Sequence, residues 1–189
     1  RALCFYAASL QDQRELYSAT DPKKADAIER RNDLLLPLVK GYCSEKAYEM
    51  LSLSLQCFGG SGYLQDYPIE QYIRDQKIDT LYEGTTHIQA LDLLLRKVAR
   101  DGGQMLRDLL GEAQATIASE EGGPDLADAR AALAKALENI QGMLMALLGK
   151  MGESLYHVGL QGNRVLMALA EVLIAWLLIR HGAVAVRKL

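Results

Sequence analysis

The sequence has few cysteines, and their spacing shows no pairing pattern. Only three occur in 189 residues, at Cys4, Cys43 and Cys57, and no two form a CxxC motif. Disulfide frameworks and zinc sites need paired or closely spaced cysteines, so neither is expected. All three lie in apolar or helical contexts, and we predict reduced thiols in the protein core. No set of His, Cys and carboxylate residues has the spacing of metal ligands, so no metal site is predicted.

The sequence also lacks an excess of basic over acidic residues and a long uninterrupted run of apolar residues. It has 21 Lys and Arg against 24 Asp and Glu, a formal net charge of −3, which excludes a strong electrostatic attraction to nucleic acid. The most apolar run, residues 165–179, contains Glu171 and is followed by Arg180. A membrane-spanning helix needs about 18–20 apolar residues. We therefore predict a buried helix or an oligomer interface here, and no membrane span.

The composition is that of a globular domain, with 50% hydrophobic and 24% charged residues. Arg1 opens within an amphipathic pattern and without an initiator Met, so we expect a fragment of a longer chain. No stretch shows the strict alternation of a β-strand, and helical periodicity runs through almost all of the sequence. These features predict an all-α fold.

Capping and breaking residues predict the helices of the first part. A first helix is expected over residues 2–18, and a second should run to residue 58, interrupted and kinked by Pro37. Pro68 suits the first turn of a short helix over residues 69–78. Thr86 and Gln89 form a capping-box pattern for a helix that runs to residue 101.

The second part is predicted from its glycines. Gly102 and Gly103 end the first part, and residues 120–125 (EEGGPD) are typical of a linker. Two helices should follow, over residues 125–150 and from 154 to the end. We expect an up-and-down bundle over residues 1–101 and a helical extension over 102–189.

A glycine-rich segment, QCFGGSGY at residues 56–63, raises the question of a phosphate site. A dinucleotide fingerprint needs a strand before its glycines, and the preceding residues are helical in pattern. Two interpretations stay open. Gly59 and Gly60 can end a helix, or their backbone can approach an anion closely, with Gln56 adding a side-chain amide.

A lone carboxylate, Glu83, lies in the gap LYEGTTHIQ between two helical patterns. Taken alone it indicates a surface acid near a helix N-terminus. Three motifs in a fixed order change this interpretation. They are QCFGGSGY, DYPIEQYIRDQKI and LYEGTTHIQ, and together they resemble the C-terminal helical domain of the acyl-CoA dehydrogenases over roughly residues 1–100. Residues 103–189 resemble the additional helical extension of one subset of that family.

The resemblance implies that Glu83 is the catalytic base. It would take the α-proton of a fatty acyl-CoA while the β-hydride passes to flavin N5, giving the trans-2-enoyl-CoA. Such a base needs a dry site, and the developing enolate needs preorganised donors. In the family, the N–H of this same residue donates to the thioester oxygen. Gly84 would let the acyl chain approach the backbone, and Tyr82 would line the CoA entrance. Some members place the base on the first helix of the domain, which we expect to be missing from this sequence, and the glutamate in this motif argues against such a placement here.

The resemblance also implies FAD as the cofactor. Gln56, Gly59 and Gly60 match positions that contact the adenosine diphosphate part of FAD in a neighbouring subunit, so a homo-oligomer, dimer or tetramer, is expected. Thr85 and His87 match contacts to FAD that follow the base. His87 departs from the Gln or Asn-like residue often found there.

The resemblance further implies electron-transfer flavoprotein as a partner and the bacterial cytoplasm as the location, ahead of the mitochondrial matrix. Other domains of the family supply most acyl-CoA and flavin contacts, so this chain alone should be inactive. The alternative is a non-catalytic helical subunit or scaffold that completes a partner's flavin site. Arg74 and Asp75, which match a pair in the family, are expected to form an ion pair that ties their short helix to the bundle.

Overall fold

The computed structural model describes residues 1–188, and all its regular elements are helical. The predicted all-α fold is confirmed. The elements are, in order, α1 (Ala2–Tyr17), α2 (Pro22–Cys57), η1 (Gly59–Tyr63), α3 (Ile69–Lys77), η2 (Ile78–Thr80), α4 (Thr86–Leu91), η3 (Asp92–Val98), η4 (Ala99–Asp101), α5 (Gln104–Ala118), η5 (Gly123–Leu126), α6 (Ala127–Met151) and α7 (Tyr156–Lys188).

Helix α2 begins where the sequence places a cap and a proline together. The Asp21 carboxylate accepts the Lys24 N–H at 3.1 Å, and Pro22 occupies the first turn, where its missing N–H costs nothing. Helix α2 continues through Pro37 to Cys57 with Pro37 buried, so the helix is not interrupted there, and the predicted kink stays a prediction. At α3 the prediction was off by one position: Pro68 is the N-cap and Ile69 begins the helix.

The helix predicted up to residue 101 changes its winding along the way. After α4 the chain continues as a π-helix, η3, and then as a 3₁₀ turn, η4. The bounds of α5, which starts after Gly103, were not predicted from the sequence. Asp101 begins this helix by accepting the N–H groups of Gly103, Gln104 and Met105 at 2.9–3.0 Å. A carboxylate followed by two glycines was therefore a start signal as well as a stop signal.

The segment predicted as a linker, residues 120–125, is held by a buried side chain. The Arg130 guanidinium is 8% exposed and donates to the carbonyl oxygens of Glu121, at 2.6 Å, and Gly123, at 2.9 Å. Because both charge-assisted hydrogen bonds join α6 to the preceding turn, the segment is a fixed corner between α5 and α6.

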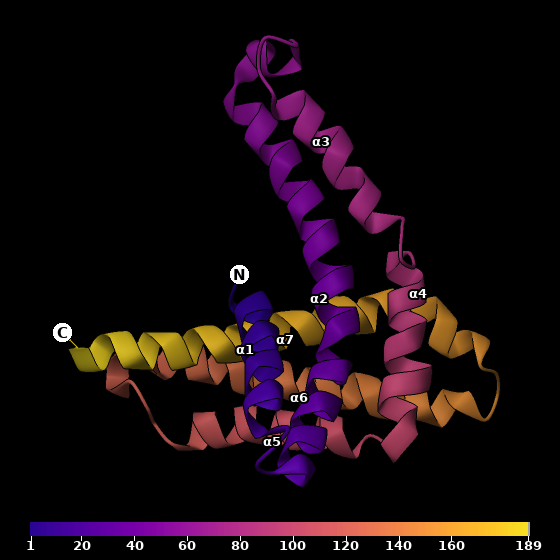
Figure 1. Ribbon diagram of the computed structural model, residues 1–189, viewed down its shortest axis with the longest axis vertical. Helices are drawn as coiled ribbons and strands as arrows, with labels where there is room; N and C mark the ends of the chain where they lie inside the picture. Colours follow the sequence, from indigo (N-terminus) through magenta and orange to yellow (C-terminus); the bar gives the residue numbers. More distant parts are fainter. Residues whose placement is uncertain (189) are drawn as a thin grey trace.

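The helices form two groups that cross. Helices α6 and α7 run side by side in opposite directions with α5 next to them, while α1, α2 and α4 lie across α7 (Figure 1). The C-terminal half of α2 and helix α3 project together from this crossing as an arm (Figure 1). One hydrophobic core spans both groups, so the segments on either side of residue 101 pack together, and a division there stays a prediction.

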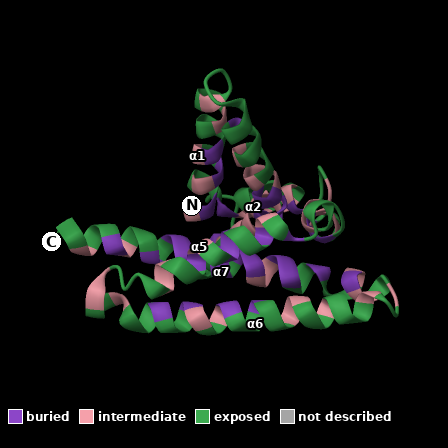
Figure 2. Cartoon of the chain, turned by 90° about the horizontal axis from the view of Figure 1, so that it is seen from below, coloured by how far each residue is buried: buried purple, intermediate pink, exposed green. Residues whose placement is uncertain are grey.

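Helix α7 supplies much of the core. Its buried side chains include Leu166, Leu169, Leu173 and Trp176, and buried residues recur along α7 more densely than along α6 (Figure 2). By length and composition alone α7 is apolar enough to cross a membrane, with a mean hydropathy of 1.8 over 18 residues, 44% of them buried. The predicted buried helix is thus confirmed for its core-facing residues, and the absence of a membrane span stays a prediction.

The cysteines are not core thiols. Cys4 and Cys57 are exposed and Cys43 is half-buried, so the prediction from their apolar context is wrong. On α1 the buried residues are Leu3, Ala7 and Leu10, so Cys4 lies beside the buried face of its helix and not on it.

Candidate active site around Glu83

Glu83 lies in the loop between η2 and α4, and its backbone is unusual. Its φ is +54°, in the left-handed region, and the next residue, Gly84, has φ +91°. Few residues other than glycine adopt this conformation, which costs about 1–2 kcal/mol for a residue with a Cβ. Such strain persists only where the surroundings impose it, and it is common at functional sites. The backbone therefore marks Glu83 independently of its sequence motif.

Side chains from two helices hold the loop. The Gln89 amide on α4 donates to the Glu83 carbonyl oxygen at 3.0 Å, and the Lys40 ammonium on α2 donates to the Gly84 carbonyl oxygen. Two consecutive carbonyls are thus fixed from opposite sides. Thr86 adds a third tie, because its hydroxyl donates to the Glu45 carboxylate on α2.

The predicted capping box is wrong in its register. Thr85, with the extended backbone of an N-cap, accepts the Ile88 N–H at 3.5 Å, while Thr86 is already helical and turns to α2. Gln89 does not reach the N-cap amide and binds the Glu83 carbonyl. Either of the two adjacent threonines could have been the N-cap. Thr86 instead binds Glu45, 41 residues away in sequence, so Thr85 is the N-cap.

Gly84 is required by its surroundings within this chain. A Cβ at this position would lie 3.1 Å from Gln89 Nε2 and 3.1 Å from Ile88 Cγ2, in addition to the strain of a left-handed backbone. The glycine therefore lets Gln89 and Ile88 pack close to the loop. Its predicted role toward an acyl chain stays a prediction.

A pocket of about 370 Å³ lies between this loop and α2. Its lining residues are Val39, Lys40, Cys43, Ser44, Ala47, Gln76, Asp79, Tyr82 and Glu83. Glu83 and Tyr82 are exposed, so the chain does not itself provide the dry site expected for a base. The hydrogen bond with the Asp79 carboxylate, and the negative charge of that group, raise the pKa of the Tyr82 phenol. Tyr82 therefore stays a neutral hydrogen-bonding group beside Glu83 at physiological pH.

The predicted FAD residues fall into two separate places. Gln56, Gly59 and Gly60 lie at the tip of the arm, whereas Thr85 and His87 lie at the start of α4 beside Glu83; α3 separates the two places (Figure 1). All five are exposed.

The glycine loop exposes part of its backbone. No atom lies within 4 Å of a Cβ built on Gly59 or on Gly60, so their backbone is open to contact. The glycine that holds the loop together is Gly62, which the sequence analysis did not single out. A Cβ there would lie 2.7 Å from the Leu55 carbonyl oxygen at the end of α2.

The expected ion pair between Arg74 and Asp75 does not form. Arg74 pairs with Glu70 one turn earlier on the same helix, at 3.1 Å, because residues four apart share a helix face and consecutive residues do not. The contact is exposed and does not tie α3 to the bundle.

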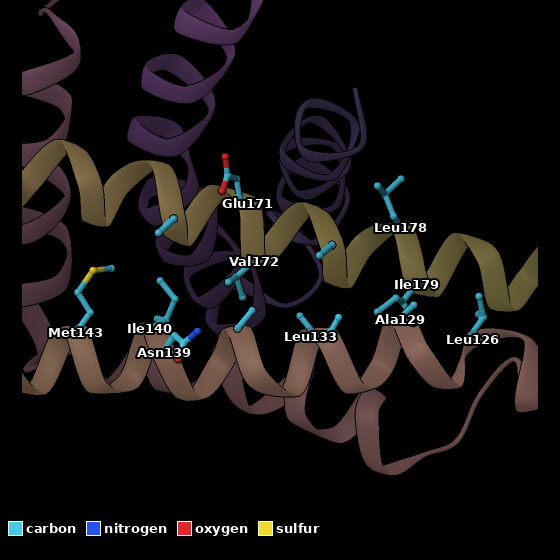
Figure 3. Close-up of a pocket in the computed structure, with 14 residues that line it drawn as sticks. Leu126, Ala129, Leu133, Asn139, Ile140, Met143, Glu171, Val172, Leu178 and Ile179 are labelled. Atoms are coloured by element: carbon cyan, nitrogen blue, oxygen red, sulfur yellow. The ribbon is translucent and has the colours of Figure 1, made fainter.

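A second cavity, of about 730 Å³, lies away from Glu83, between α6 and α7. Leu133 and Ile140 point from α6 toward α7, while Glu171 and Leu178 point away from α6 (Figure 3). Its lining is apolar apart from Asn139 and Glu171, and none of the predicted site residues contributes to it. No group of three or more His, Cys, Asp or Glu residues within residues 1–188 could hold a metal ion.

Comparison with known proteins places both parts of the chain. Residues 1–98 match the family model "Acyl-CoA dehydrogenase, C-terminal domain", and residues 109–189 match "Acetyl-CoA dehydrogenase C-terminal like". The whole chain is 50% identical to a broad-specificity linear acyl-CoA dehydrogenase of Mycobacterium tuberculosis, of which it covers 32%. Over 57% of its length it is 43% identical to a 3-methylmercaptopropionyl-CoA dehydrogenase of Ruegeria pomeroyi, of which it covers 20%.

Among solved structures, Caenorhabditis elegans ACDH-11 in complex with C11-CoA is similar over 96% of this chain and 30% of its own, with a TM-score of 0.77 and 25% identity. The chain thus spans about a third or less of the length of the relatives named here. With the family model matched over residues 1–98, more than half of the sequence, this chain belongs to the acyl-CoA dehydrogenase family.

Proposed function

We propose that this chain is the C-terminal part of an FAD-dependent acyl-CoA dehydrogenase in which Glu83 is the catalytic base. The observation that carries the proposal is the left-handed backbone of Glu83, which Gln89 and Lys40 hold at the edge of a pocket. Linear fatty acyl-CoA thioesters are the proposed substrates, in line with the name of the Mycobacterium tuberculosis relative.

In the proposed reaction the Glu83 carboxylate takes the α-proton of the acyl-CoA and becomes the carboxylic acid. Negative charge then develops on the thioester oxygen. No backbone carbonyl of the described residues accepts the Glu83 N–H, so this group is free to donate to that oxygen. FAD, when bound, supplies the acceptor for the β-hydride, and the product is the trans-2-enoyl-CoA. Tyr82 and Gly84 are proposed to contact the substrate beside the base.

The FAD contacts are proposed to come from two subunits. Thr85 and His87 are near the base, whereas Gln56, Gly59 and Gly60 lie at the opposite end of α3 (Figure 1). We infer that the glycine loop contacts the adenosine diphosphate part of a FAD in a neighbouring subunit, which requires a homo-oligomer. Light scattering of the full-length, flavin-loaded protein should give a dimer or tetramer; a flavin-loaded monomer would contradict this inference.

We further propose that electrons pass to an electron-transfer flavoprotein and that the enzyme works in a bacterial cytoplasm, since two of the named relatives are bacterial. The segments 1–101 and 102–189 are proposed to be the C-terminal domain and its extension. Helix α7 is proposed to be a core helix of the extension, with no membrane span.

The decisive experiment replaces the carboxylate. In the full-length protein, Glu83→Gln should keep FAD, measured by flavin absorbance, but should lose turnover of octanoyl- or palmitoyl-CoA by at least ~100-fold, because an amide cannot accept the proton. Glu70→Gln is the matched control: it removes a carboxylate of α3 that pairs only with Arg74 on the surface, and it should leave turnover unchanged. Near-normal turnover in Glu83→Gln would exclude Glu83 as the base and favour a non-catalytic role for this part of the chain.

A further inference from the structure

Two of the three cysteines face each other across a helix interface. The Sγ atoms of Cys4 on α1 and Cys43 on α2 are 3.6 Å apart, although 39 positions separate the residues in the sequence. Cys57, at the end of α2, has no thiol partner among the described residues and donates to the Leu53 carbonyl oxygen of its own helix. The chain therefore contains one thiol pair and one separate thiol.

We propose that Cys4 and Cys43 are an oxidation site that forms a reversible disulfide, tethering α1 to α2 beside the Glu83 pocket. A disulfide has an S–S distance of about 2.0 Å, so each sulfur has to move by roughly 0.8 Å, which lies within reach of a small side-chain rotation. Helix α1 already packs against the first part of α2, so no large rearrangement of the backbone is needed.

The two thiols differ in a way that assigns their roles. Cys4 is exposed, so an oxidant can reach its sulfur, whereas Cys43 is half-buried. Burial, together with the hydrogen bond to Cys4, raises the pKa of the Cys43 thiol to about 11, so Cys43 stays a protonated thiol and is a poor first target. Cys4 is therefore oxidised first, and Cys43 reacts second.

The oxidant is a hydroperoxide, and the reaction balances in two steps. In the first, the Cys4 thiol attacks the O–O bond, giving the Cys4 sulfenic acid and an alcohol, or water when the oxidant is hydrogen peroxide. In the second, the Cys43 sulfur attacks the Cys4 sulfur; the S–S bond forms, the S–O bond breaks, and the departing hydroxide takes the Cys43 proton as water. Each sulfur loses one electron, and the two electrons reduce the peroxide bond.

The location gives the bond a consequence for the neighbouring pocket. Cys43 also lines the pocket that contains Glu83 and Lys40. Formation of the disulfide fixes the Cys43 side chain against α1, and with it that wall of the pocket. Disulfides inside cells are typically transient and redox-sensing, which fits a pair that is reduced at rest. The proposal stands on the thiol geometry and does not depend on the role of Glu83.

Peptide mapping of the full-length protein tests the proposal directly. Trypsin separates the three cysteines into the peptides 2–14, 41–46 and 47–74, because cleavage follows Arg1, Arg14, Lys40, Lys46 and Arg74. After hydrogen peroxide and blocking with N-ethylmaleimide, mass spectrometry without reductant should find peptides 2–14 and 41–46 joined, with the loss of two hydrogens. Treatment with a phosphine reductant before blocking should abolish this species.

Two variants complete the test. Cys57→Ser is the matched control and should keep the linked peptide. Cys43→Ser should abolish it and leave the Cys4 sulfenic acid open to dimedone. The proposal is overturned if peroxide leaves Cys4 fully alkylated, oxidises it to sulfinic or sulfonic acid without a link, or links it to Cys57. If Cys43→Ser does not fold, the wild-type peptide map decides alone.

Discussion

The backbone at Glu83 is held in place against its own preference. A left-handed glutamate costs about 1–2 kcal/mol, and each hydrogen bond to a loop carbonyl returns about 0.5–1.5 kcal/mol. The contacts from Gln89 and Lys40 are therefore of the size needed to keep the conformation. Glutamate is retained at a position where the backbone itself would favour glycine.

Two truncations at this position separate the backbone from the carboxylate. Glu83→Ala and Glu83→Gly both remove the carboxylate, but only glycine adopts φ +54° without steric cost. In the full-length protein, Glu83→Gly should be more stable than Glu83→Ala by about 1 kcal/mol, as measured by urea denaturation. Equal stabilities of the two variants would mean that the left-handed conformation is absent in solution.

The sequence predicted the place of Glu83 but not the residues that hold it. Its motif and the gap between helical patterns were sufficient to single out the carboxylate. Lys40 could not be found in this way, because its partner, the Gly84 carbonyl, is 44 residues away and local spacing carries no information about that contact. The wrong N-cap prediction at Thr86 has the same cause, since the Thr86 hydroxyl donates to the Glu45 carboxylate on α2.

At the scale of the elements, the loop at the end of α2 contains glycines with different structural roles. Gly62 is buried against the Leu55 carbonyl, whereas Gly60 has open space on its side-chain face and no left-handed φ. The first is needed to close the loop on the helix, and the second is free for a contact outside the chain.

Alanine substitutions should distinguish these roles. Gly62→Ala should lower the stability of the full-length protein by about 1–3 kcal/mol, because its Cβ would lie 2.7 Å from a backbone oxygen. Gly60→Ala should leave stability within about 0.5 kcal/mol but weaken FAD retention, if this backbone contacts the cofactor. Calorimetry and flavin absorbance measure the two effects. Full FAD retention in Gly60→Ala would remove Gly60 from the proposed contact.

Helix boundaries were predictable where a single residue type sets them. Asp21 with Pro22 starts α2, and the glycines after residue 101 end the first part. The winding of η3 was not predictable, because its seven residues make fewer than two helical turns, too few for apolar periodicity to distinguish a π-helix from an α-helix. Pro37 shows the limit of a local rule, since α2 continues through it.

At the scale of the whole molecule, Trp176 joins three helices. Its ring is 1% exposed and meets Tyr6 of α1 edge-on, with ring centroids 5.8 Å apart, while its Nε1–H donates to the Thr116 hydroxyl of α5 at 2.9 Å. One side chain of α7 thus contacts both helix groups at their crossing.

Thr116 tests this junction. Thr116→Val keeps the shape but leaves the buried indole N–H without an acceptor, so the full-length protein should lose about 1–3 kcal/mol of stability in thermal unfolding. Thr116→Ser keeps the acceptor and should lose clearly less. Wild-type stability in Thr116→Val would mean that the hydrogen bond to Trp176 contributes nothing to this junction.

The crossing of the two helix groups could not be predicted from the sequence. Amphipathic periodicity shows which face of a helix is buried but not which helix covers it, and α7 is apolar on nearly all sides, so its pattern favours no partner. The sequence predicted a buried α7 and left open that α1, α2 and α4 lie across it.

The nine-residue helix α3 connects the glycine loop to the Glu83 loop, and this gives its length a meaning separate from its composition. A helix of nine residues is a rod about 14 Å long, and adding one residue turns everything beyond it by about 100°. Only Ile69 of its nine residues is buried, so most of its side chains can be exchanged at little cost. Substitutions in α3 should therefore be tolerated, whereas insertions and deletions should not, because the length of this short helix sets the spacing between the two proposed FAD-contact surfaces.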